Sequence, residues 1–122
     1  HPKLKMVVAE GDAGWIPHYK YRADHAIARL GPAVECQLTR PPSEYIDENV
    51  SFTFQDDETA YRNQDVIDSG CLMWANDYPH TDACWPISQQ ILDEQMGHLT
   101  IEQQNACVHD NVKKLFNLNV NV

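Results

Sequence analysis

Carboxylate and imidazole side chains gather in three loops of the sequence, and these are groups that bind divalent metals. The loops span residues 10–15, 55–57 and 76–85. Glu10 lies in the first loop, and Asp77 and His80 lie in the last. Because divalent cations take carboxylate oxygens and imidazole nitrogens as ligands, the three loops together would form a candidate metal site. Plain solvated loops are the alternative, since any acidic protein collects Asp and Glu there.

Each loop follows a short apolar run that predicts a buried strand. The runs cover residues 4–9, 49–54 and 71–75. They are rich in β-branched or aromatic residues and show no polar alternation, which indicates a parallel sheet covered by helices. Ligands of parallel α/β folds bind beyond the carboxyl ends of the strands. We therefore expect the three loops to meet at one edge of the sheet.

Helical spacing of apolar residues predicts the elements between and after the strands. The predicted helices cover residues 15–30, 43–47, 58–67, 87–96, a segment from residue 100, and 110–116. Pro17 fits only the first turn of its helix, and Gly31 is expected to end that helix. Ser43 and Thr100 are predicted N-caps, because a hydroxyl there can accept a hydrogen bond from a free backbone N–H.

The composition is that of one acidic globular domain over residues 1–122. The formal net charge is −9, so the surface should repel nucleic acid and anionic membranes. No apolar stretch approaches the roughly 20 residues that span a bilayer, and no signal peptide is visible. The chain starts at His1 without an initiator Met, so we expect a processed or truncated chain.

The four cysteines are expected to be reduced thiols. They are Cys36, Cys71, Cys84 and Cys107. None belongs to a C-x-x-C pair, which argues against a zinc finger. With 43% hydrophobic residues, the chain can fold without disulfide bonds. Because reduced thiols are typical of the cytoplasm, we expect a cytoplasmic protein.

Four features of the sequence form a recognisable set: residues 52–57 (FTFQDD), residues 72–80 (LMWANDYPH), Asp82, and Trp85 with Pro86. This set resembles the amidohydrolase-related family, which includes relatives of aminocarboxymuconate-semialdehyde decarboxylase. Residues 1–5 and 10–17 are similar to the family's sixth strand and following helix, and residues 111–116 to its terminal helix. The resemblance runs over nearly the whole chain, and the Asp-Tyr-Pro-His segment is its most specific part.

The resemblance implies an α/β fold, the C-terminal part of a (β/α)₈ TIM barrel. A complete barrel takes roughly 250 residues, so this chain would supply the last three β/α units and the terminal helices. The family's metal-binding His residues on the first and fifth strands have no counterpart here. Its Asp at the end of the eighth strand matches Asp77. Decarboxylase members carry a His after the sixth strand, where this chain has Glu10.

These matches imply roles for individual residues. Asp77 is expected to bind the metal and to act in catalysis, with Glu10 as a second catalytic group. His80 and Trp15 are expected to contact the substrate. The cofactor is expected to be a divalent metal, zinc in the first place, with its other ligands upstream. Packing is the alternative role for Trp15, and a structural contact is the alternative for Glu10.

The function predicted from these residues is that of a metal-dependent hydrolase acting on a small carbonyl or carboxylate compound. One alternative is a non-oxidative decarboxylase of the same superfamily, and another is a non-catalytic fragment in isolation. A carbohydrate- or aromatic-binding module, suggested by the tryptophans and tyrosines, is a third. The expected partner is a small-molecule substrate, with neither nucleic acid nor membrane. A homo-oligomer is also considered.

Overall fold

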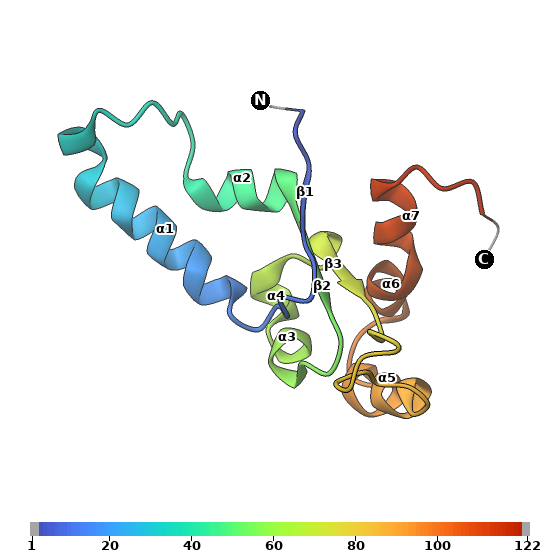
Figure 1. Cartoon of the computed structure of the whole chain (residues 1–122). Coiled ribbons are helices and arrows are strands. Elements are labelled where there is room, and N and C mark those ends of the chain that lie inside the picture. Colours follow the sequence, from blue (N-terminus) through green and yellow to red (C-terminus); the bar gives the residue numbers. More distant parts are fainter. Residues whose placement is uncertain (1–2, 121–122) are drawn as a thin grey trace.

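The predicted strands form one parallel sheet in the computed structural model, which describes residues 3–120. The strands are β1 (Met6–Val8), β2 (Val50–Phe54) and β3 (Leu72–Trp74). The central strand is β2: Val50 pairs with Met6 on one side, and Phe52 pairs with Leu72 on the other. All three strands point the same way, so their carboxyl ends meet at one edge of the sheet (Figure 1).

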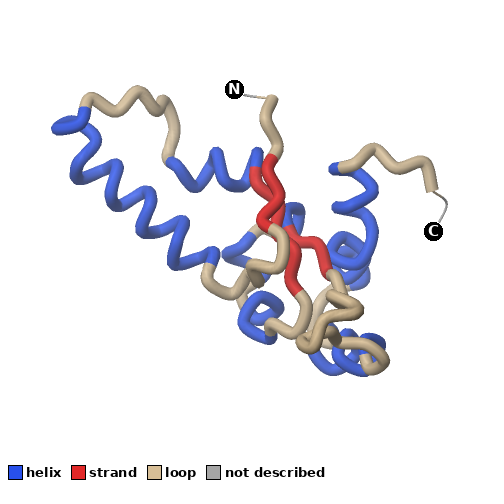
Figure 2. Tube along the Cα trace, in the orientation of Figure 1, coloured by secondary structure: helices blue, strands red, loops and turns tan. Residues whose placement is uncertain are grey.

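Helices connect and follow the strands in the predicted order. They are α1 (Ile16–Leu30), α2 (Pro42–Asn49), α3 (Glu58–Arg62), α4 (Gln64–Ile67), α5 (Ser88–Met96), α6 (Ile101–Asn105) and α7 (Asn111–Leu115). The short 3₁₀ helices Gly31–Val34 and Ser69–Cys71 and the π-helical turn Ala106–Asp110 lie between them (Figure 2). In Figure 1, α1 and α2 lie on one side of the strands, and α6 and α7 lie on the other. The α/β class with a parallel sheet is confirmed.

The core lies between the sheet and the helices packed against it. Phe54 of β2 and Leu72 of β3 are almost completely buried, together with Ile16 and Ile67 from the helical layer. The ring of Phe54 meets the ring of Tyr61 edge-on, with centroids 5.1 Å apart. Full burial of one large apolar side chain contributes roughly 1.5–3 kcal/mol. These contacts fix the helices to β2 and β3.

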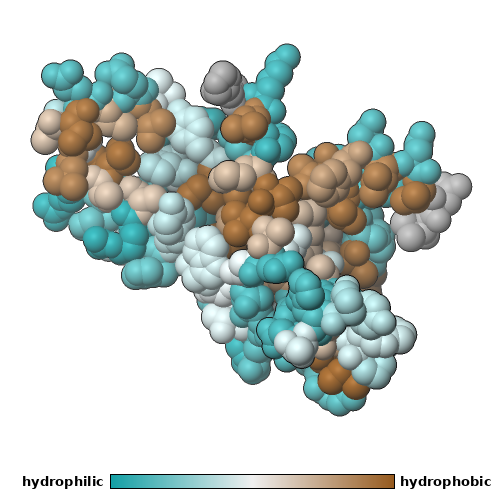
Figure 3. All heavy atoms as spheres, in the orientation of Figure 1, coloured by the Kyte–Doolittle hydropathy of each residue, from teal (hydrophilic) through white to brown (hydrophobic). Residues whose placement is uncertain are grey.

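Strand β1 differs from the other two because two of its three side chains are exposed and only Val8 packs against the core. Met6 is 52% exposed, Val7 is 37% exposed, and Leu4 just before the strand is 62% exposed. The prediction of a buried strand is therefore wrong for β1. Strand β3 also lies at a sheet edge, but the turn Ala106–Asp110 and α7 pack against it, whereas no helix among residues 3–120 covers β1 to a comparable extent. Figure 3 shows hydrophobic side chains at the surface over the strands.

The N-cap predicted for α2 is wrong, because a distant residue satisfies the first turn of that helix. Ser43 lies inside α2, which begins at Pro42. Its backbone N–H and its hydroxyl donate to the two carboxylate oxygens of Asp24, at 2.9 and 2.7 Å. Asp24 belongs to α1, so this contact also ties α1 to α2. Local sequence offered no sign of it.

Other local predictions are confirmed. Pro17 lies in the first turn of α1, and Thr100 forms a capping box with Gln103 at the start of α6.

The single helix predicted over residues 58–67 is broken at Asn63 into α3 and α4. His1 and Pro2, which belong to the family resemblance, lie outside the described residues. Within the described part of the chain, no helix has both the length and the apolar character needed to cross a membrane.

Candidate metal and active site

The three acidic loops meet at the carboxyl ends of the strands and enclose a small cavity. Its volume is about 80 Å³. The lining residues come from all three strand ends: Glu10, Asp12, Thr53, Phe54, Gln55, Ala75, Asp77 and Asp82. Such a volume holds a cation with a few water molecules, whereas pockets for small organic ligands measure about 300–1,000 Å³. The cavity can therefore form one wall of a larger site.

Asp77 lies at the centre of this arrangement and is held in a tight turn. Its side chain is only 19% exposed, and its backbone is left-handed, with φ of 57°. The N–H of His80 donates to the carbonyl of Asp77 at 3.0 Å and closes the turn. His80 Nδ1 lies 3.0 and 2.9 Å from the two carboxylate oxygens of Asp77. The turn thus pairs the carboxylate with an imidazole that is 62% exposed.

Glu10 approaches this pair from the end of β1. One ligand atom each from Glu10, Asp77 and His80 lies within 4.8 Å of the others. Two carboxylate oxygens and one imidazole nitrogen are a donor set that Zn²⁺ and Mn²⁺ accept, and three protein ligands suffice for a catalytic metal. The residues present therefore fit a divalent cation. Three of the four predicted site residues are brought together.

The loop that carries Glu10 starts with an unusual backbone conformation. Glu10 has φ of 54°, and Asp12 has φ of 50°. A non-glycine residue in the left-handed region is uncommon and costs on the order of 1–3 kcal/mol. The backbone N–H of Glu10 donates to Thr53 Oγ1 at 2.8 Å, which anchors this turn to β2. Such conformations cluster at binding and catalytic sites, which agrees with the position of Glu10.

Asp12 and Asp82 also line the cavity, although the sequence predicted neither as a site residue and named Asp82 only within the family resemblance. Burial raises the pKa of Asp12, and the neighbouring Asp57 carboxylate adds to this, while the backbone N–H of Gln55 acts in the opposite direction. The side-chain amide of Gln55 donates to the carbonyl and to the carboxylate of Asp82, at 3.0 and 3.2 Å. Both acids lie in the loops that follow predicted strands, and this position was the sequence signal that could have identified them.

Trp15 is the predicted site residue that does not join the group of Glu10, Asp77 and His80, and neither Trp15 nor His80 lines the cavity itself. Its indole N–H donates to the carbonyl of Gly11 at 2.7 Å. Its ring packs edge-on against Phe52 and Tyr19, with centroids 5.7 and 5.5 Å apart. These are the contacts of a packing residue that supports the loop after β1. They match the alternative role considered for Trp15.

The cysteines offer no reactive thiol at this site. All four are free, and Cys71, Cys84 and Cys107 are buried. Burial raises the pKa of the Cys71 thiol to about 12, and burial also raises the pKa of Cys84. A nucleophilic cysteine needs a lowered pKa, so the chemistry of the site belongs to its carboxylates.

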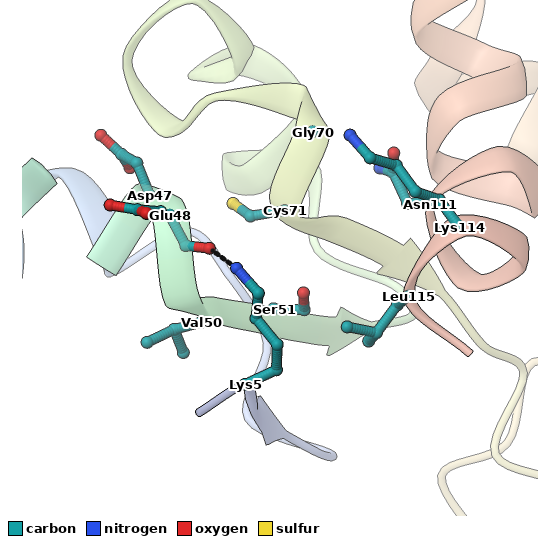
Figure 4. Close-up of a pocket in the computed structure, with 10 residues that line it drawn as sticks. All are labelled: Lys5, Asp47, Glu48, Val50, Ser51, Gly70, Cys71, Asn111, Lys114 and Leu115. Atoms are coloured by element: carbon teal, nitrogen blue, oxygen red, sulfur yellow. Dashed lines mark hydrogen bonds between the residues drawn. The ribbon is translucent and has the colours of Figure 1, made fainter. Parts of the chain in front are cut away.

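A larger cavity lies at the opposite end of the strands (Figure 4). Its volume is about 230 Å³, and its lining includes Lys5, Ser51, Asn111 and Lys114. The ammonium of Lys5 donates to the backbone carbonyl of Glu48, drawn as the dashed line in Figure 4. None of the predicted site residues lines it. Barrel enzymes place their chemistry at the carboxyl ends of the strands, so the smaller cavity is the candidate site.

No protein-family model matches this sequence, and no curated protein matches it. Solved structures do match its fold. The first is 5-carboxyvanillate decarboxylase LigW from Sphingomonas paucimobilis, with a TM-score of 0.78, 22% identity and 97% of this chain covered. Another is a 2,6-dihydroxybenzoate decarboxylase complexed with 2,6-dihydroxybenzoate, with a TM-score of 0.71, 18% identity and 97% coverage. A third is a dihydroxybenzoic acid decarboxylase from Polaromonas sp. JS666 with bound manganese and the inhibitor 2-nitroresorcinol. Its TM-score is 0.73, its identity is 18%, and 98% of this chain is covered.

The chain spans about 35% of the length of these decarboxylases. They are decarboxylases with a TIM-barrel fold. At identities of 18–22%, the likeness concerns the fold. The three parallel strands and their helices therefore have the fold of about one third of these decarboxylases.

Proposed function

We propose that this chain is part of a metal-dependent, non-oxidative decarboxylase of the amidohydrolase superfamily that acts on a small aromatic carboxylate. The observation that carries the proposal is the meeting of Asp77, Glu10 and His80 at the carboxyl edge of the sheet. The fold likeness to three decarboxylases of hydroxylated aromatic acids supports this reaction over the hydrolysis first expected from the sequence.

The four free thiols support the expected cytoplasmic location.

The charge of the cavity supports a metal-dependent reaction. Four carboxylates line it, from Glu10, Asp12, Asp77 and Asp82. An anionic substrate would be repelled by this group unless a cation offsets the charge. Asp77 would hold that cation, with Glu10 and His80 within reach. A bound divalent cation supplies a Lewis acid for the oxygens of the substrate. One of the similar enzymes contains manganese, so Mn²⁺ joins Zn²⁺ as a candidate.

The reaction needs a proton where the carboxylate leaves. The bond between the ring carbon and the carboxylate carbon breaks, CO₂ departs, and the ring carbon takes up the proton. Glu10 follows β1, the place where decarboxylases of the family carry a His, and it faces the same cavity as Asp77. In this proposal Glu10 handles the proton, and His80 orients Asp77 or contacts the substrate.

The test is decarboxylation of 2,6-dihydroxybenzoate and 5-carboxyvanillate with Mn²⁺ or Zn²⁺, followed by CO₂ release. It is run with the 122-residue chain and with any longer protein that contains it. We expect turnover in a form with a complete barrel, and loss of turnover after metal chelation. Turnover that survives chelation would reject the proposal.

Hydrolysis stays the second candidate because Glu10 departs from the decarboxylase pattern. A carboxylate at this place can activate a water molecule for attack on a carbonyl carbon. Lactone and amide substrates assayed beside the aromatic acids separate the two functions. Release of an acid from a lactone without any CO₂ would favour the hydrolase.

A further inference from the structure

The loops after β1 and β2 are joined by the carboxylate of Asp57. One oxygen, Oδ2, accepts hydrogen bonds from the backbone N–H groups of Ala13 and Gly14, at 2.9 and 2.7 Å. The other oxygen, Oδ1, accepts from the N–H of Ala60 at 3.0 Å and caps α3. One partly buried side chain therefore holds two separate loops. Hydrogen bonds to an ionised acceptor are roughly twice as strong as neutral ones.

Close packing holds the two loops in this relation. Ala13 is completely buried. A Cβ added to Gly14 would lie 2.6 Å from Thr59 Cβ and 2.9 Å from Asp57 Oδ1. Contacts under 3.0 Å force a displacement, so only glycine lets the loop after β1 approach Asp57 this closely. The loop has no room to slide along α3 while these hydrogen bonds persist.

The start of the same loop is anchored as well. The backbone N–H of Glu10 donates to Thr53 Oγ1 at 2.8 Å. Strand β2 and the residues after it thus hold the loop at both ends, through Thr53 at one end and Asp57 at the other. Between these anchors, the left-handed residues Glu10 and Asp12 turn the chain so that both line the cavity with Asp77.

We propose that Asp57 is a positioning residue of the candidate metal site and acts through the loop that carries Glu10. It does not line the cavity, so it need not touch the cation or the substrate. Its carboxylate fixes residues 10–15 against β2 and keeps Glu10 within ligand distance of Asp77. The link to metal binding rests on the proposed function, whereas the effect on the loop does not.

The experiment compares two N-cap deletions in the 122-residue chain. Asp57→Ala removes the cap of α3 together with the bonds to Ala13 and Gly14. Thr100→Ala removes the cap of α6 and leaves the site intact. Both variants lose one helix N-cap, so Thr100→Ala controls for that loss, and any further change in Asp57→Ala comes from the bonds to Ala13 and Gly14. The readouts are amide hydrogen exchange of residues 10–15 and the dissociation constant for Mn²⁺ alone.

We expect Asp57→Ala to speed exchange at Ala13 and Gly14 and to weaken Mn²⁺ binding by about 10–100-fold, as loss of a supporting contact does. Thr100→Ala should change neither. Gly14→Ala keeps the carboxylate and displaces the loop, so it should reproduce the Asp57→Ala result. Asp57→Asn retains an N-cap oxygen, so its exchange rates and its Mn²⁺ affinity should fall between those of wild type and Asp57→Ala. This variant replaces Asp57→Ala in the comparison if the alanine variant does not fold.

Two outcomes would overturn the proposal. One is unchanged exchange at Ala13 and Gly14 in Asp57→Ala, and the other is Mn²⁺ binding as tight as in wild type despite faster exchange. An equal loss of Mn²⁺ binding in Thr100→Ala would reduce Asp57 to a structural role. If Asp77→Asn binds Mn²⁺ as tightly as wild type, the proposed function is rejected instead. The hydrogen-exchange data would then still test whether Asp57 holds residues 10–15 in place.

Discussion

The two ends of the parallel sheet carry cavities with different charge. The one at the amino ends has a volume of about 230 Å³, and its lining balances two lysines, Lys5 and Lys114, with two acids, Asp47 and Glu48. The one at the carboxyl ends measures about 80 Å³ and is lined by four carboxylates. Of these two cavities, the first is the larger. The second is the better candidate for a functional site. The loops that follow parallel strands gather there, and their residues can vary without disturbing the core.

The polar groups at the two ends also differ in their partners. At the amino ends, Lys5 donates to the carbonyl of Glu48, and the amide of Asn111 donates to the carbonyl of Leu72 at 2.7 Å. These contacts join elements of the fold. At the carboxyl ends, desolvation raises the pKa of Asp12, and the neighbouring carboxylates of Asp57, Asp82 and Asp56 raise it further. Crowded like charges cost stability, and such a cost is characteristic of sites kept for binding or catalysis.

The largest expected effect follows from Asp77→Asn. The change keeps the size of the side chain and removes the negative charge that would hold a cation. Turnover should fall on the order of 10³-fold, with a matching loss of metal content. Asp77→Glu should restore little, because the extra methylene displaces the oxygens. Kinetics, metal analysis and a thermal melt check it, and near-normal turnover in a folded variant would move the site elsewhere.

A smaller effect is expected for Glu10→Gln at the same end of the sheet. The amide keeps the shape but cannot take up or release the proton. Turnover should fall by about 10²-fold, while the melting temperature changes little. The measurement is turnover across a pH series for both proteins. Identical profiles for variant and wild type would assign Glu10 to a structural role.

Asp12→Asn should affect stability and its dependence on pH. The pKa of Asp12 is raised above its ordinary value of 3.8. The folded state therefore holds this proton more tightly than the unfolded chain, and stability falls as pH rises through the folded-state pKa. Removing the acid should raise stability at pH 7 and change little below pH 3.8. Metal-free thermal melts at both pH values test this, and an equal shift at both would exclude ionisation as the cause.

The smallest effect is expected at the amino end, from Lys5→Gln. Its ammonium contacts the carbonyl of Glu48 but none of the acids at the other edge. Turnover and Mn²⁺ affinity should stay within about twofold, and the free energy of unfolding within about 0.5 kcal/mol. A loss of turnover as large as that of Glu10→Gln would reverse the assignment of the two ends.

Much of the candidate site was predictable because it depends on short stretches of sequence. Asp77 follows a recognisable apolar strand, and His80 lies one turn further on, so their pairing is local. The approach of Glu10 depends on strand pairing instead. It required β1 to lie parallel to β2, and β2 to β3, in the observed register. Asp12 was harder to find, because its side chain stays exposed and the acids whose charges reach it, Asp57 and Asp82, follow other strands.

The sequence by itself determined the order of strands and helices, the caps formed within one turn, such as that of Thr100, and the loop that holds Asp77. Only the tertiary structure decided that Asp24 caps α2, that β1 is exposed, and that Asp57 binds backbone groups 43 and 44 residues away. The physical reason is distance along the chain. Propensities and caps act between residues three or four apart, whereas burial and long-range hydrogen bonds exist only after the strands have paired.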